Sequence, residues 1–162
     1  MKILILALAR TGSTNFLFRL AKEHNLTPIF EPRQKEEFKE DTDNIVIKCI
    51  LWCVPKDEIW FNELIKKFDK VILLSRRNLK ELTESLSYLK HNLDKGFDSY
   101  SEYLWEMTPN YIETEQEVIE NNQKLIRLSK TIGVEITYYE DLYKDSIAGK
   151  LRLGNLEKRT LL

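Results

Sequence analysis

Continuous apolar runs alternate with amphipathic segments along this chain, and this alternation constrains the fold more than any other feature. Residues 2–8 (K-I-L-I-L-A-L) and 71–75 (V-I-L-L-S) are almost wholly apolar. A strand covered on both faces has such a continuous run, whereas a half-exposed strand alternates apolar and polar residues. The segments between the runs have helical periodicity, which favours parallel strands with right-handed crossovers. We expect one α/β domain over residues 1–162, with three α/β/α layers and a mostly parallel sheet.

The same patterns predict where the elements lie. Strands are expected over residues 2–8, 27–30, 44–51, 71–75 and 134–138, with the strand at 27–30 beside the first strand. Helices are expected over residues 14–24, 56–68, 79–91, 109–132 and 139–142, a loop or short helix over 34–44, and a basic tail over 146–162. Asn25 and Gly133 are typical helix stops. Asn78 and Glu81 have the spacing of a capping box at the start of one helix.

A polar loop, A-R-T-G-S-T-N at residues 9–15, joins the first strand to the first helix. A buried strand, a tight loop and a helix form a P-loop-like phosphate cradle, because the first amides of the helix point at one spot. Gly12 would let the backbone approach an anion closely. Ser13 and Thr14 suit the N-cap position, and Arg10 adds a permanent positive charge. The loop lacks the second glycine and the lysine of an ATP-binding P-loop.

A second candidate anion site follows the strand at 71–75. Arg77 lies at the end of that strand, and Ser85 lies eight residues later along the next predicted helix. An arginine and a hydroxyl so placed can hold one phosphate from two sides. Ligands of open parallel sheets bind beyond the carboxyl ends of the strands, where Arg10 and Arg77 are both expected. Arg76, one residue out of register, is an alternative to Arg77.

Taken together, these motifs resemble those of the sulfotransferases that use 3′-phosphoadenosine 5′-phosphosulfate (PAPS). R-T-G-S-T resembles the loop that binds the 5′-phosphosulfate, with Ala9 in place of the usual proline and Thr11 in place of the usual serine. V-I-L-L-S-R-R-N-L-K-E-L-T-E-S resembles the segment that holds the 3′-phosphate, with Arg77 and Ser85 at the matching positions. Three shorter segments resemble the family as well: F-E-P at 30–32, I-V-I-K at 45–48 and Y-E-D-L at 139–142.

The resemblance implies a sulfotransferase domain that moves a sulfuryl group from PAPS to a hydroxyl or amine of a small-molecule or glycan acceptor, with the desulfated nucleotide PAP as product. The residues that it implies for binding PAPS are Arg10, Thr11, Gly12, Ser13, Thr14, Arg77 and Ser85. Arg10 and Lys48 would stabilise charge on the sulfonate. Glu31, whose exit direction Pro32 restricts, would take the acceptor proton, and His91 is the other candidate base.

The alternatives for these residues are ordinary surface roles. Glu31 could pair with Arg33 or Lys35, and Lys48 could be a strand-end lysine that reaches solvent. The chain also departs from the family: Ile50 stands where enzymes that act on phenols place a histidine, and the C-terminal nucleotide loop is not recognisable. Two other functions therefore stay open. One is a P-loop-type nucleotide kinase, which needs a loop lysine and a carboxylate for Mg²⁺, and the other is a non-catalytic nucleotide-binding module.

Composition narrows the range of partners. The net charge of −1 does not favour nucleic acid as a partner. No apolar run is as long as a membrane span, so we expect a cytoplasmic protein. Cys49 and Cys53 have no histidine nearby and are expected to be buried thiols, and no acidic cluster has the spacing of metal ligands. No metal is expected, and the oligomeric state stays open. The aromatic residues of the later part are expected in the core or at an acceptor site: Tyr88, Tyr100, Tyr103 and Trp105.

Overall fold

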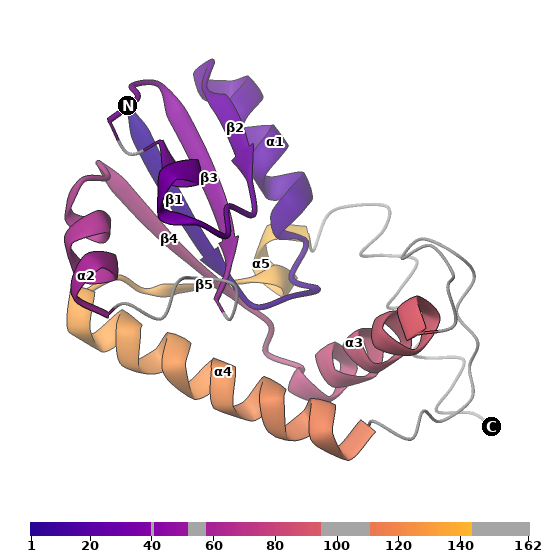
Figure 1. Ribbon diagram of the computed structural model, residues 1–162. Helices are drawn as coiled ribbons and strands as arrows, with labels where there is room; N and C mark the ends of the chain where they lie inside the picture. The colour runs from indigo at the N-terminus through magenta and orange to yellow at the C-terminus, as the bar shows by residue number, and fades with distance from the viewer. Residues whose placement is uncertain (40, 52–57, 95–110, 144–162) are drawn as a thin grey trace.

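A computed structural model describes residues 1–39, 41–51, 58–94 and 111–143 (Figure 1). In the described part of the chain a single five-stranded sheet has the order β2-β3-β1-β4-β5, and every neighbouring pair of strands is parallel. The strands are β1 (Lys2–Ala7), β2 (Thr27–Phe30), β3 (Ile45–Ile50), β4 (Lys70–Ser75) and β5 (Ile136–Tyr138). The predicted parallel α/β fold is thus confirmed.

One predicted strand neighbour is wrong. The strand at 27–30 was expected beside the first strand, but β2 pairs with β3 and forms an edge of the sheet. Its residues are mostly exposed, and its second residue is Pro28. A proline has no backbone N–H to donate to a second neighbour, so it is tolerated in an edge strand. Pro28 therefore indicates an edge position. The length and hydrophobicity of the strand do not indicate its position in the sheet.

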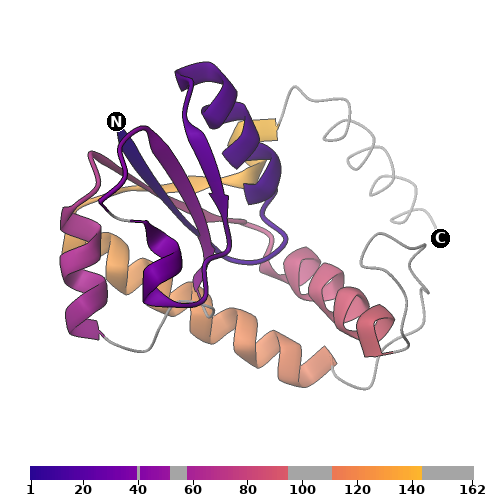
Figure 2. The same ribbon diagram turned by 45° about the horizontal axis from the view of Figure 1, so that its top comes forward.

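The helices form two layers, one on each side of the sheet. The described helices are α1 (Ser13–His24), α2 (Glu58–Lys66), α3 (Leu79–Asp94), α4 (Tyr111–Ile132), α5 (Tyr139–Tyr143) and a 3₁₀ turn, η1 (Lys35–Phe38). α1 lies on one face of the sheet, and α2 and α4 lie on the other (Figures 1 and 2). The three-layer arrangement is therefore confirmed. Asn25 and Gly133 have left-handed backbone angles just after α1 and α4, as expected of helix stops.

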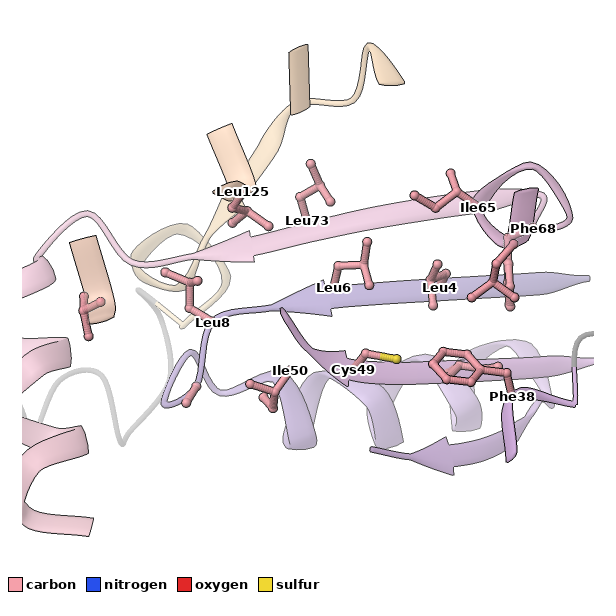
Figure 3. Close-up of a cluster of buried hydrophobic side chains, with 14 of the residues drawn as sticks. Leu4, Leu6, Leu8, Phe38, Cys49, Ile50, Ile65, Phe68, Leu73 and Leu125 are labelled. Carbon is pink, nitrogen blue, oxygen red and sulfur yellow. The ribbon is translucent and has the colours of Figure 1, made fainter. Parts of the chain in front are cut away.

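Alternate residues of β1 belong to two separate cores, which explains its continuous apolar run. Leu4 and Leu6 pack in the cluster beneath α2 and α4, together with Phe38, Cys49 and Leu73 (Figure 3). Ile3 and Ile5 face the other way and pack against Phe16, Leu17 and Leu20 of α1. Since side chains alternate along a strand, a central strand covered on both faces needs apolar residues at every position.

Several predicted boundaries shift by a few residues. α2 ends at Lys66 rather than at residue 68, β5 begins at Ile136 rather than at residue 134, and α3 extends to Asp94. These shifts lie at the ends of elements, where boundaries are least well defined, and they do not change the arrangement of the elements. The predicted sites at Cys53, Tyr100, Tyr103 and Trp105 and the tail at 146–162 lie outside the described residues, as do the side chains of Tyr88 and His91.

Candidate functional site

The loop after β1 turns into α1 at Gly12, which is the N-cap residue, with φ 68° and ψ 13°. The first hydrogen bond of the helix runs from the Phe16 N–H to the Gly12 carbonyl, at 3.1 Å. The expectation that Ser13 or Thr14 is the N-cap is wrong, because Ser13 is already helical and no side chain caps the helix. The early N–H groups of α1 still lack carbonyl partners within the helix, as at any helix N-terminus. They can therefore donate to an anion.

The hydroxyl of Thr11 stabilises the loop rather than facing a ligand. Thr11 is buried, and its Oγ1 donates to the Leu8 carbonyl at 2.8 Å. The backbone of Arg10 has a φ of 60°. A residue other than glycine is uncommon at such an angle, and the surrounding structure must offset the strain of this backbone conformation. The bond from Thr11 supplies part of that constraint.

The absence of a side chain at Gly12 serves packing as well as backbone conformation. A Cβ atom there would lie 2.8 Å from the Tyr143 ring and 2.9 Å from the Tyr139 ring. Both tyrosines belong to α5, and their ring centroids are 4.8 Å apart. Gly12 was expected to make room for an anion, but the space beside its Cα is occupied by tyrosine rings. An anion must therefore approach the loop from the direction of the free amides.

Arg10 and Ser85 meet across the carboxyl edge of the sheet. Arg10 Nε donates to Ser85 Oγ at 3.0 Å, which joins the loop after β1 to α3. β1 and β4 are adjacent strands, so the loop after one lies beside the helix after the other. The sequence suggested Ser85 as the partner of Arg77 in holding a phosphate. The structure instead joins Ser85 to the cation of the loop.

Lys48 lies in the interior of β3 and is buried, with only 2% of its side chain exposed. Its Nζ contacts the carboxylate of Glu31, lies 3.4 Å from Thr14 Oγ1 and lies 4.4 Å from the centroid of the Phe30 ring. The alternative of a lysine that reaches solvent is therefore wrong. The ammonium group connects the loop after β1, at residues 9–14 and called the anion loop below, to the end of β2.

Glu31 follows β2 and forms an ion pair with Lys48. The partner of its carboxylate is therefore Lys48 and not Arg33 or Lys35, which were the alternative partners suggested by the sequence. Its φ is 46°, and its N–H donates to the Lys48 carbonyl at 2.8 Å. This left-handed turn directs the carboxylate back over the sheet. A quarter of the Glu31 side chain is exposed, so it is accessible from solvent.

Arg77 is half exposed and forms a bidentate pair with Asp141 of α5, at 2.7 and 2.6 Å. The hydrogen bond to Asp141 raises the pKa of the Arg77 guanidinium above its ordinary value. The backbone N–H of Arg77 donates to both carboxylate oxygens of Glu140, at 3.1 Å each. The Asp141 carboxylate thus occupies guanidinium donors that were expected to hold a phosphate.

Arg76 is buried, and its position was the weaker prediction from the sequence. Its guanidinium pairs with Glu81 at 2.9 Å and lies 4.7 Å from the centroid of the Tyr139 ring. Its Nε–H is buried with no hydrogen-bond partner. Because Ile72 and Leu74 pack on the α1 side of β4, the two-residue period continues to Arg76 on that same side. This alternation was the signal that could have found it.

The predicted capping box at the start of α3 is half formed. The Glu81 N–H donates to Asn78 Oδ1 at 3.1 Å, as expected of an N-cap. The Glu81 carboxylate turns to Arg76 instead of bonding back to the backbone of Asn78. A buried guanidinium binds a carboxylate more strongly than an exposed amide does, which explains the exchange.

The remaining predicted features are mostly packing residues. Cys49 is buried, as expected, and Ile50 is buried in the core beside it. Within residues 1–39, 41–51, 58–94 and 111–143, no three histidine, cysteine, aspartate or glutamate side chains are grouped so that they could hold a metal ion. No helix in these ranges is long and apolar enough to cross a membrane.

Neither the family models nor the curated proteins include a match to this sequence. A solved structure shares the fold. It is the crystal structure of the YorR protein from Bacillus subtilis in complex with phosphorylated GDP, with a TM-score of 0.53 and 98% of each chain covered. The two sequences are 14% identical. This likeness extends over the whole chain and supports the α/β architecture.

Proposed function

We propose that this protein transfers a sulfuryl group from PAPS to an acceptor hydroxyl or amine at the carboxyl edge of β1, β2 and β3. The observation that supports this most is the contact of Lys48 with both Glu31 and Thr14. This contact brings together the three groups that sulfuryl transfer needs. The end of the anion loop would bind the donor, the Lys48 cation would meet the charge of the sulfonate, and the Glu31 carboxylate would act as base for the acceptor.

The reaction is an in-line displacement at sulfur. The acceptor oxygen or nitrogen forms a bond to sulfur, and the bond from sulfur to the 5′-phosphate oxygen breaks, so that PAP leaves. Glu31 accepts the proton that the acceptor loses. Lys48 and Arg10 stabilise the negative charge that grows on the departing phosphate, as fixed cations do in phosphoryl transfer.

The nucleotide would lie across the ends of β1 and β4. Its 5′-phosphosulfate would lie against the amides of residues 11–14, and its 3′-phosphate would lie near Ser85 and Arg77. The bond between Arg10 and Ser85 brings these two regions together. Arg77 would exchange Asp141 for the 3′-phosphate as the nucleotide binds.

A second candidate is a nucleotide-binding protein or phosphotransferase of another kind. The YorR protein, whose fold is similar, was crystallised with phosphorylated GDP. The loop of this chain has no lysine, but the Lys48 ammonium reaches Thr14 from the neighbouring strand. That position could serve a γ-phosphoryl group as well as a sulfonate, so ligand preference decides between the two.

Calorimetric titration with PAPS, PAP, AMP, ATP and GDP tests the proposal. We expect PAP and PAPS to bind more tightly than AMP, because only they carry a 3′-phosphate. Arg77→Ala should weaken PAP binding by roughly 10-fold and leave AMP binding unchanged. Arg127→Ala, which removes an exposed arginine of α4, is the matched control. Equal affinity for PAP and AMP in the wild type would overturn the proposal, and a preference for GDP or ATP would favour the second candidate.

A further inference from the structure

We infer that Tyr143 of α5 is a positioning residue of the anion loop, whose hydroxyl orients the Gly12–Ser13 peptide so that the Ser13 N–H faces the bound anion. The inference rests on the proposed function in one respect, that the loop binds the phosphosulfate of the nucleotide. The hydroxyl donates to the Gly12 carbonyl at 2.8 Å, between residues 131 positions apart in the chain. No motif in the sequence joins these two residues.

The orientation follows from the geometry of the peptide bond. The Gly12 carbonyl accepts two hydrogen bonds, one from Tyr143 and one from the Phe16 N–H. In a trans peptide the carbonyl and the next N–H point in opposite directions within one plane. With the carbonyl held from two sides, the Ser13 N–H must point out of the helix. That direction is the one from which an anion can approach.

Gly12 is the residue of the loop that most needs such a constraint. Glycine reaches more backbone conformations than other residues. The backbone of Gly12 is therefore not fixed by its own conformational preference and needs contacts from other residues to hold it. The Tyr143 and Tyr139 rings lie against its Cα, where a Cβ atom would come within 2.9 Å of each. The rings therefore restrict the position of Gly12, and the hydroxyl restricts the rotation of its peptide.

Tyr143 itself is held by contacts at the other end of α5. Glu140 accepts from the backbone N–H groups of Arg77 and Asn78, and Asp141 pairs with the Arg77 side chain. The helix is thus anchored to the turn after β4 while its last residue reaches the loop after β1. Burial raises the pKa of the Tyr143 hydroxyl, which keeps it protonated and able to donate.

Tyr143→Phe tests the inference, because it removes the hydroxyl and keeps the ring over Gly12. Inorganic pyrophosphate, 5′-AMP and PAP are titrated into the wild type and the variant by calorimetry, and amide exchange of Ser13 is followed by NMR. We expect all three ligands to bind roughly 5- to 10-fold more weakly to the variant, because one orienting hydrogen bond is lost. We also expect less protection of the Ser13 amide in the pyrophosphate complex.

Ser129→Ala is the matched control, since it removes another partly buried hydroxyl that donates to a carbonyl, that of Val134 at 2.7 Å. It should lower the melting temperature about as much as Tyr143→Phe does but leave pyrophosphate affinity unchanged. Pyrophosphate affinity within twofold of wild type in Tyr143→Phe would overturn the inference, and so would a wild type that binds none of the three ligands. A wild type that binds PAP no better than 5′-AMP would overturn the proposed function alone, and the pyrophosphate comparison would still decide the role of Tyr143.

Discussion

Lys48 occupies a position that stability alone does not explain. A buried ion pair is seldom more stable than two apolar side chains of similar volume, because both charges lose water. Lys48 is nonetheless almost fully buried in the middle of the sheet, next to Ile5 of β1 in the strand register. The Glu31 carboxylate and the Phe30 ring offset part of the cost of its charge. The position of this charge agrees with the role that we propose for Lys48 beside the sulfonate.

The substitution Glu31→Gln tests the base in the proposed reaction. It keeps the size of the side chain and an oxygen to accept from Lys48 but removes the basicity. We expect turnover of PAPS to fall by roughly 10²- to 10⁴-fold, the range usual for a general base. PAP affinity, measured by calorimetry, should stay within a few-fold of wild type. Glu23→Gln on the exposed side of α1 is the control and should be neutral. Normal turnover of Glu31→Gln, with loss of turnover in His91→Ala, would pass the role to His91.

At the scale of elements, the short helix α5 has more influence than its length suggests. It carries the two tyrosines that lie against Gly12 and the two carboxylates that pair with the turn after β4. The loop after β1, the start of α3 and α5 are therefore one connected unit. The bonds that Glu140 accepts come from backbone N–H groups, so α5 is expected to stay in place when the Arg77 side chain is changed.

The substitution Asp141→Asn tests whether α5 competes with the nucleotide for Arg77. The variant keeps the shape of the side chain but removes the charge that now pairs with the guanidinium. The pair is half exposed, so solvent weakens it, and we expect PAP affinity to rise by roughly 2- to 5-fold. AMP affinity should not change, since AMP lacks the 3′-phosphate. Asp43→Asn, which removes the charge of an exposed carboxylate paired with Lys2, is the control. A fall in PAP affinity would mean that Asp141 holds Arg77 in place for the nucleotide.

At the scale of the whole molecule, the parallel sheet gathers charged groups of both signs at one edge, in a chain whose net charge is −1. Arg10, Arg76 and Arg77 follow β1 and β4, and Lys48 reaches the same edge from β3. All strands of a parallel sheet end on the same side, so residues far apart in the sequence meet there. Three of these cations pair there with carboxylates of the chain, Arg76 with Glu81, Arg77 with Asp141 and Lys48 with Glu31. An anionic ligand at this edge would compete with those carboxylates.

We expect turnover of PAPS to be independent of added divalent metal. The cations Arg10 and Lys48 lie beside the loop and can meet the charge of the transferred sulfonate, which is lower than that of a γ-phosphoryl group. Activity assayed with EDTA, and then with excess Mg²⁺, should be the same within experimental error. Activity that EDTA abolishes and Mg²⁺ restores would favour the kinase alternative.

Local sequence patterns determined the elements and the class of fold. The apolar runs, the helical stripe of Phe16, Leu17 and Leu20 and the left-handed stops at Asn25 and Gly133 are properties of neighbouring residues, and they were predicted correctly. The loop after the first strand and the burial of Cys49 were predicted for the same reason. Periodicity reports which face of an element is covered, and that information is contained in a few consecutive residues.

Only the tertiary structure decided which elements are neighbours and which polar side chains meet. The position of β2 beside β3, the bond of Arg10 to Ser85 and the contact of Tyr143 with Gly12 join residues that are distant in the sequence. Such pairs depend on strand order and on the direction of each side chain at the sheet edge. Because side chains alternate in direction, Arg76 is buried whereas Arg77, one residue later, is half exposed. A sequence pattern lists the charged groups near an edge, but the packing of α5 and α3 decides which of them is left for a ligand.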